Sequence, residues 1–148
     1  MPVTDEQVAW LRTYLAGESE VAQQLYDQLT GAADAAGLGA LVYAAFVIAA
    51  RQKFASGWAR ADLIKFIAQT RQSLGVRPDV FDPLVAENQL ARALGEQSPD
   101  SPDVKANARA QLVLLNALVV NADLEDEAVF SLLIRARKMA DRILNDAV

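Results

Sequence analysis

Apolar side chains recur three and four residues apart along most of the chain, which is the spacing of one face of an α-helix. The first stripe consists of Val8, Leu11 and Leu15. Thr4, followed three residues later by Gln7, forms a capping box ahead of this stripe and predicts the start of a helix. No stretch alternates apolar and polar residues between turn residues, as a half-buried strand would. The pattern therefore predicts an all-α protein.

Six further helices are expected after the first one. The apolar spacing and the capping residues place them at about 19–29, 38–54, 59–73, 83–94, 102–120 and 124–144. Glycines are expected to stop five of the seven, in the order Gly17, Gly31, Gly57, Gly75 and Gly95. Asp82–Pro83 and Ser101–Pro102 each combine a capping side chain with a proline for the first turn. We therefore expect a single domain over residues 1–148, a globular bundle of six or seven helices.

Two of these helices are apolar on nearly every side and are expected to lie at the centre of the bundle. One follows residues 32–37, where alanines favour helix and glycines favour a break. The sixteen residues 35–50 carry no charge, but that run is shorter than the ~17–25 residues of a membrane-spanning helix. The other is most apolar over residues 110–120. We expect neighbouring helices to bury both, and we expect no membrane.

The clearest change of composition lies at residues 96–103, Glu-Gln-Ser-Pro-Asp-Ser-Pro-Asp. This segment offers no apolar side chain to bury, and its prolines cannot donate helical hydrogen bonds. We expect a surface linker at about 96–101 that is the main protease-sensitive site of the folded protein.

The chain contains no cysteine and no histidine. This composition excludes disulfides, thiolate metal sites, zinc sites of the usual kind and the catalytic triads that depend on these residues. Asp123, Glu125 and Asp126 lack the spacing of a calcium loop and are expected to cap and begin the last helix. We therefore expect no enzyme activity, no cofactor and no metal.

Two further features concern the source and the compartment. The lack of cysteine favours a reducing compartment, and the first six residues contain no basic stretch followed by an apolar run, as a secretory signal would. We expect a cytoplasmic protein. The alanine-rich composition favours a bacterial source.

The chain is acidic overall, with a formal net charge of −5 and an isoelectric point near 4.7, but its bases are unevenly placed. Residues 51–77 hold six of the fourteen lysines and arginines. A basic helical hairpin of this kind is typical of nucleic-acid-binding regulators, with the helix at 60–73 as the reading element. Its candidate contacts are Arg60, Lys65 and Arg71.

Two observations weigh against nucleic acid as the partner of this segment. The whole chain is acidic, whereas a duplex-binding domain usually presents a basic field. The helix at 60–73 also has few polar side chains that could contact base edges beyond Gln69 and Gln72. We expect instead that the bases pair with the acidic flanks within the fold or across an interface with another copy.

Trp10 and Tyr14 lie one turn apart on the first helix, beside its apolar stripe. Core packing is the expected role of both rings. If they are exposed, they are candidate anchors for a partner, because Trp and Tyr supply large contact areas with a polar group attached.

The composition favours a non-enzymatic helical interaction domain that self-associates or binds another protein. Hydrophobic residues make up 53% of the chain, so we expect an apolar helix face to remain available to a partner. Two alternatives stay open. One is the nucleic-acid-binding regulator that uses residues 51–77, and the other is a helical pocket for an apolar ligand near Tyr43 and Phe46.

Overall fold

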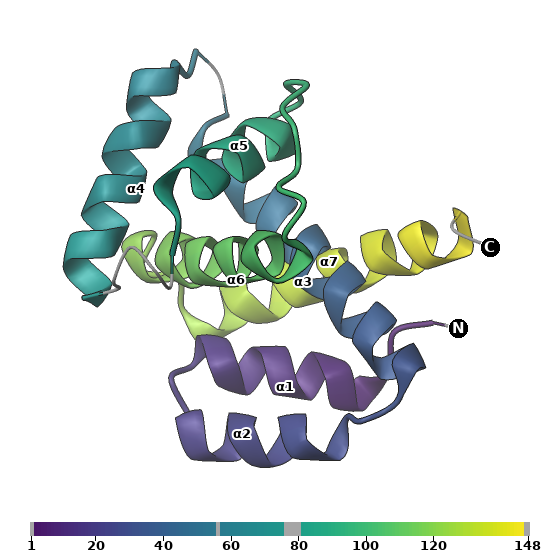
Figure 1. Cartoon of the computed structure of the whole chain (residues 1–148). Coiled ribbons are helices and arrows are strands. Elements are labelled where there is room, and N and C mark those ends of the chain that lie inside the picture. Colours follow the sequence, from purple (N-terminus) through teal and green to yellow (C-terminus); the bar gives the residue numbers. More distant parts are fainter. Residues whose placement is uncertain (1, 56, 76–80, 147–148) are drawn as a thin grey trace. The chain divides into compact units, whose positions relative to one another are not determined.

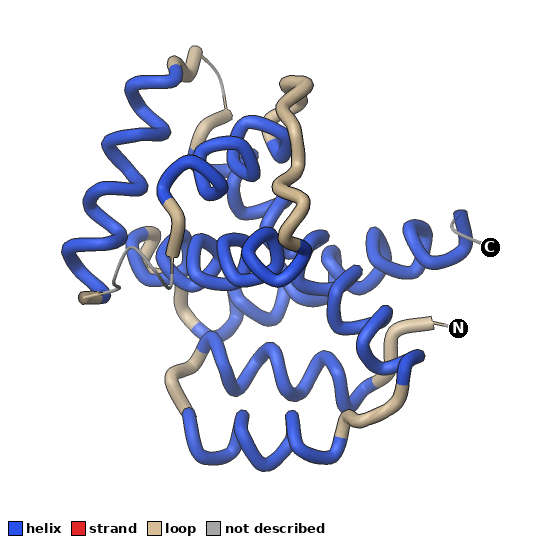
Figure 2. Tube along the Cα trace, viewed as in Figure 1, coloured by secondary structure: helices blue, strands red, loops and turns tan. Residues whose placement is uncertain are grey.

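The computed structural model of the chain describes residues 2–55, 57–75 and 81–146. Within these ranges every regular element is a helix, which confirms the predicted all-α class (Figures 1 and 2). The helices found there are α1 (Asp5–Leu15), α2 (Ser19–Gln28), α3 (Ala32–Lys53), α4 (Arg60–Leu74), α5 (Pro83–Ala93), α6 (Val104–Asn121) and α7 (Asp126–Asp146). The chain divides into two compact units, called here unit 1 (Met1–Ala45 with Asp123–Val148) and unit 2 (Phe46–Ala122).

The first helix of unit 1 begins with the predicted capping box. The Gln7 amide donates to Thr4 Oγ1 at 3.2 Å, and the Thr4 amide donates to Gln7 Oε1 at 3.1 Å. The same side chain donates from Nε2 to Asp34 Oδ1 at 3.0 Å, which ties the start of α1 to the start of α3. Figure 1 shows α1 and α2 side by side.

The first apolar helix, α3, begins at Ala32 rather than at the predicted Leu38. Gly37 lies within this helix, and the Gln7 side chain packs directly against the glycine and leaves no room for a Cβ atom. Glycine at this position therefore marks a close approach between two helices and not a break in one of them.

The length of α3 overturns part of the argument against a membrane span. Its 22 residues are long and apolar enough to cross a bilayer by length and composition, because the helix continues beyond the uncharged run at both ends. Half of its most apolar window is buried inside the protein. Burial, not length, is therefore what supports a role for α3 in the core.

The last helix of unit 1 packs together with the N-terminal residues. It buries Leu132, Leu133, Ala136 and Ala140. The Val3 amide donates to Asp141 Oδ1 at 2.7 Å, and the Val3 carbonyl accepts from Arg137 Nη2 at 2.8 Å. Arg137 also pairs with Asp5 at 2.6 Å. Residues from the two ends of the chain are thus joined on one face of α7.

Unit 2 consists of the second half of α3 with α4, α5 and α6, and α5 packs against both α4 and α6. Asp82 caps α5 as predicted and accepts from the Leu84 amide at 2.8 Å, with Pro83 in the first turn. Gly75 ends α4 as predicted, with a φ of 63°. The largest fully buried side chains of this unit include Phe46, Leu63, Phe81, Leu90, Leu114 and Leu115.

The second apolar helix, α6, begins later than predicted. Its N-cap is Asp103 and not Ser101. The Asp103 carboxylate accepts from the backbone amides of Lys105 and Ala106, at 3.1 and 3.2 Å. A carboxylate is the stronger acceptor for these amides, and the Ser101 hydroxyl instead accepts from the Asp103 amide at 3.1 Å. The helix buries six of its twelve apolar side chains, whereas Val104 and Val120 are exposed.

Two further boundaries differ from their predictions. α2 ends at Gln28, where the chain leaves the helix through Leu29 without a left-handed residue, so Gly31 is not its cap. α7 begins at Asp126 after a turn in which Asp123 has a positive φ of 50°. Asp123 thus belongs to the turn and not to the helix.

Candidate functional site

The three basic residues proposed on α4 do not share one face of the helix. At about 100° per residue, Lys65 lies about 140° from Arg60 and about 120° from Arg71 around the helix axis. Lys65 is exposed, whereas Arg60 and Arg71 are only partly accessible. The buried face of α4 consists of Leu63, Phe66, Ile67 and Thr70. The helix therefore presents no continuous basic stripe formed by all three.

Arg60 is occupied within unit 2. Its Nη1 atom pairs with Glu87 at 2.8 Å, and its Nη2 atom lies 3.3 Å from Glu96 and 2.9 Å from Ser98 Oγ. Both glutamates belong to the acidic flank of the basic segment. Arg60 is therefore placed to hold α4 against α5 and the following loop.

Two other bases of residues 51–77 also have contacts inside unit 2. Arg51 Nε donates to the carbonyl of Ala93 at 2.9 Å, at the end of α5. The ammonium group of Lys53 lies 5.7 Å from the ring centre of Phe54 and 5.2 Å from that of Phe66, within the range of cation–π attraction. Arg77 lies outside the described residues.

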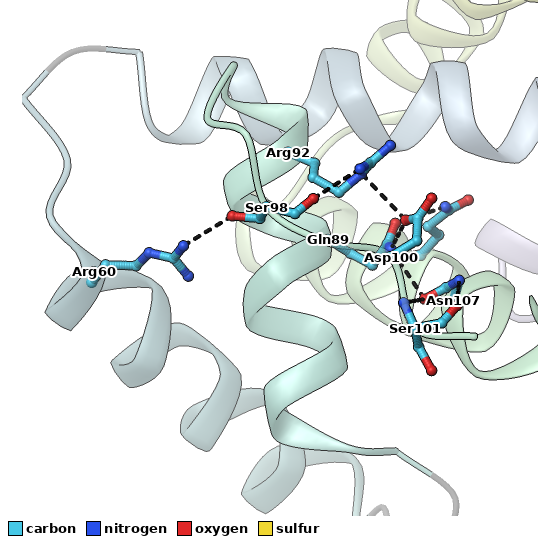
Figure 3. A network of polar contacts seen from close by, with 8 residues as sticks. Arg60, Gln89, Arg92, Ser98, Asp100, Ser101 and Asn107 are labelled. Atoms are coloured by element: carbon cyan, nitrogen blue, oxygen red, sulfur yellow. Dashed lines mark hydrogen bonds and ion pairs between the residues drawn. The ribbon is translucent and has the colours of Figure 1, made fainter. Parts of the chain in front are cut away.

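Residues 96–101, the predicted linker, form a loop that is hydrogen-bonded to the buried side-chain amides of Gln89 and Asn107 (Figure 3). Gln89 is only 2% exposed, and its Nε2 atom donates to Asp100 at 2.7 Å and to Asn107 Oδ1 at 3.2 Å. Its Oε1 atom accepts from Gln111 at 2.9 Å. The Asn107 side chain accepts from the Ser101 amide and donates to the Ser101 carbonyl.

Ser98 is the second anchor of this loop. It is 5% exposed, its carbonyl accepts from Arg92 Nη1 at 2.8 Å, and its hydroxyl contacts Arg60. Arg92 Nε lies 3.2 Å from Asp100 Oδ1, which makes an ion pair although the two atoms are not aligned for a hydrogen bond. Apart from Arg92 Nε, the polar side chains of this cluster hydrogen-bond to one another and to the loop, so the evident role of the cluster is to hold the loop.

The two aromatic candidates of α1 belong to a ring cluster in unit 1. Trp10 is 7% exposed, and its ring centre lies 5.8 Å from that of Tyr14 and 5.9 Å from that of Tyr26. Burial raises the pKa of the Tyr14 hydroxyl because the ionised form loses solvation. Trp10 is thus placed to stabilise the packing of α1 on α2. Tyr26, which is 51% exposed, is the accessible member of the cluster.

A depression of about 580 Å³ lies at the start of α7 and opens widely to solvent. It is lined by Asp123, Leu124, Glu125, Glu127, Ala128 and Ser131. No group of three ligating side chains that could hold a metal ion occurs among the residues that the structure describes. Phe46 is fully buried, and the apolar pocket expected near Tyr43 and Phe46 stays a prediction.

The outer face of α7 carries the feature that best resembles a binding surface. Phe130 is 59% exposed and Ile134 is 44% exposed, one helical turn apart. Glu127 precedes them by one turn and Lys138 follows by one turn, and both are exposed. These four residues, called here the α7 stripe, lie within about 80° of the helix circumference, opposite the buried face.

We did not predict this stripe from the sequence. The signal was nevertheless present, because Phe130 and Ile134 fall outside the spacing that Leu132, Leu133 and Ala136 define.

No protein-family model, curated protein or solved structure matches this chain.

Proposed function

We propose that this protein is a non-enzymatic helical interaction domain that self-associates through the outer face of α7. The observation that carries the proposal is the pair of large apolar side chains, Phe130 and Ile134, which stand in solvent one turn apart on a regular helix. Apolar side chains at this spacing are how a helix presents a contact surface to another helix. The surrounding charged residues keep the face soluble when it is free.

The other interpretations have less support. For the nucleic-acid alternative, Arg60 is engaged with Glu87 and Glu96, and Lys65 points away from the remaining bases of α4. For an enzyme, the sequence lacks histidine, the side chain that most often transfers protons near neutral pH, and it lacks cysteine as a nucleophile. We further propose that α3 is a core helix of a cytoplasmic protein, in line with its burial.

The expected complex is weak and reversible. A helix pair of this size buries less than the ~1,600 Å² of a standard stable interface. Self-association should therefore depend strongly on protein concentration.

Sedimentation velocity over a range of protein concentrations tests the proposal. The wild type should shift from monomer to dimer as the concentration rises, and Phe130→Ser with Ile134→Ser should move the midpoint by about tenfold or more, because the apolar contact is lost. Leu84→Ser with Val104→Ser is the matched control, since both side chains are exposed and lie in unit 2.

Three outcomes would contradict the proposal. They are a wild type that stays monomeric up to about millimolar concentration, a control pair that disrupts association equally, and binding of duplex DNA at physiological salt by a monomeric protein.

A further inference from the structure

The order of residues along the α7 stripe has a near-symmetric form. From the N-terminal end it consists of an acid, two apolar side chains and a base, namely Glu127, Phe130, Ile134 and Lys138. The midpoint of the four lies near residue 132. The acid on one side of that midpoint corresponds to the base on the other side, and the two apolar side chains correspond to each other. A surface of this kind can pair with a second copy of itself about a two-fold axis.

We infer that the occupant of this face is a second copy of the chain, with the two α7 helices running antiparallel. The inference rests on the proposed function and adds the orientation of the partner. In this arrangement Phe130 of one copy packs against the partner's Ile134, and Glu127 faces the partner's Lys138. Both contacts occur twice in each dimer, because the two-fold axis repeats them.

Charge decides between the two possible directions of the helices. In a parallel pair, each Glu127 would face the other and each Lys138 would face the other, which places like charges together at both ends of the stripe. In an antiparallel pair the same four residues give two opposite-charge contacts. The net charge along the helix agrees, since Asp126 and Glu127 stand at its start, and over residues 135–146 four bases outnumber the two acids, Asp141 and Asp146.

The depression at the start of α7 extends the same surface. Glu127 is one of its lining residues, beside Asp123 and Glu125, so the acidic end of the stripe has further acids next to it. In the antiparallel arrangement the basic half of the partner's helix approaches this acidic end. Electrostatic attraction then favours encounter in the productive orientation and weakens as salt rises.

Cysteine cross-linking tests the orientation directly, because the native chain contains no cysteine. Positions 127 and 138 are eleven residues apart on one helix, about 16 Å along its axis. A disulfide requires Cα atoms within about 7 Å of each other. In the antiparallel dimer, Glu127→Cys can therefore bond only to a partner that carries Lys138→Cys, and neither variant can bond to another copy of itself.

The experiment oxidises Glu127→Cys alone, Lys138→Cys alone and an equal mixture of the two, each at a concentration where the wild type is dimeric. The mixture should give about tenfold more disulfide-linked dimer than either variant alone. Adding Phe130→Ser and Ile134→Ser to both variants should remove that excess. A mixture of Glu127→Cys with Lys105→Cys, an exposed site on α6 of unit 2, is the control for random collision.

Self-linking of Glu127→Cys as efficient as linking in the mixture would establish a parallel pair and overturn the inference. Equal yields from the mixture and from the Lys105 control would overturn it too, and would leave self-association standing if the wild type is dimeric. A wild type that is monomeric at every concentration would overturn both the inference and the proposed function.

Discussion

Residues 96–101 of unit 2 and the outer face of α7 in unit 1 differ in both composition and contacts. The loop is polar and contains no helix, yet Ser98 is buried and Asp100 and Ser101 bond to side chains that reach them from α5 and α6. The α7 face belongs to a regular helix, yet it exposes two large apolar side chains. The polar segment is thus held within the fold, and the apolar one is open.

The difference lies in the partners that each region has within the chain. Around the loop, Gln89 and Asn107 supply donors and acceptors that satisfy one another and the loop. On the outer side of α7, the residues one turn away from Phe130 are Glu127 and Ile134, and both are exposed. A surface is a candidate for binding when its own fold leaves it uncovered, whatever its polarity.

Among the changes that test this comparison, Gln89→Ala should have the largest effect on the free energy of unfolding. The change removes the donor that the buried Asn107 shares with the exposed Asp100, and it leaves Gln111 without its acceptor, so we expect the free energy of unfolding to fall by about 1–3 kcal/mol. A protease should also cut the loop faster than in the wild type. Urea unfolding and limited proteolysis with mass spectrometry measure both effects.

Gln72→Ala, an exposed glutamine on α4, is the matched control and should change the free energy of unfolding by less than about 0.5 kcal/mol. If Gln89→Ala behaved like this control, the contacts of Gln89 would not be what holds the loop.

An effect of intermediate size is expected at Gly37 in unit 1. There the buried side-chain amide of Gln7 hydrogen-bonds to Thr4 and Asp34. Gly37→Ala should lower the free energy of unfolding by about 1–2 kcal/mol, because its Cβ would displace the Gln7 side chain from Thr4 and Asp34. Gly39→Ala, in the same helix with open space around it, should raise that free energy by up to about 1 kcal/mol. Equal effects of the two changes in urea unfolding would refute the close approach of Gln7 to α3.

The smallest effect on folding is expected from Phe130→Ser with Ile134→Ser, the same pair that should weaken association by about tenfold or more. Since both side chains already meet solvent, the free energy of unfolding measured in dilute solution should fall by about 1 kcal/mol or less. Leu133→Ser on the same helix, where the side chain is buried, should cost more than about 3 kcal/mol. A similar loss from both changes would mean that Phe130 and Ile134 belong to the core.

Local signals predicted much of the fold. The capping box at Thr4, the proline start at Pro83 and the glycine stop at Gly75 were all read correctly, because each depends on residues within one turn of one another. The start of α3 was not predicted correctly. Gly37 suggested a break in the helix, whereas the glycine allows a close contact with Gln7, thirty residues earlier. A single sequence gives no sign of such a contact.

The polar anchor of the loop was equally out of reach. Gln89 and Asn107 are eighteen residues apart and form no motif, and amides at such positions are ordinary on helix surfaces. The α7 stripe was within reach, because the periodicity that places Leu133 inside also places Phe130 outside. The sequence could not supply the exposed fractions of Phe130 and Ile134. These fractions show that the two side chains form one exposed pair on the helix and are not isolated apolar residues.

The bond between Val3 and Asp141 has a consequence for the order in which the protein takes shape. The two residues are 138 positions apart, and α1 cannot complete its packing on α7 until nearly the whole chain has left the ribosome. Unit 2 is continuous in sequence from Phe46 to Ala122, so all of its helices are available earlier. Pairings close in sequence form before those that must close a long loop. Unit 2 should therefore form first. α1 can pack on α2 early, but Val3 and the surface of α1 that packs on α7 should stay exposed until the last helix has been made.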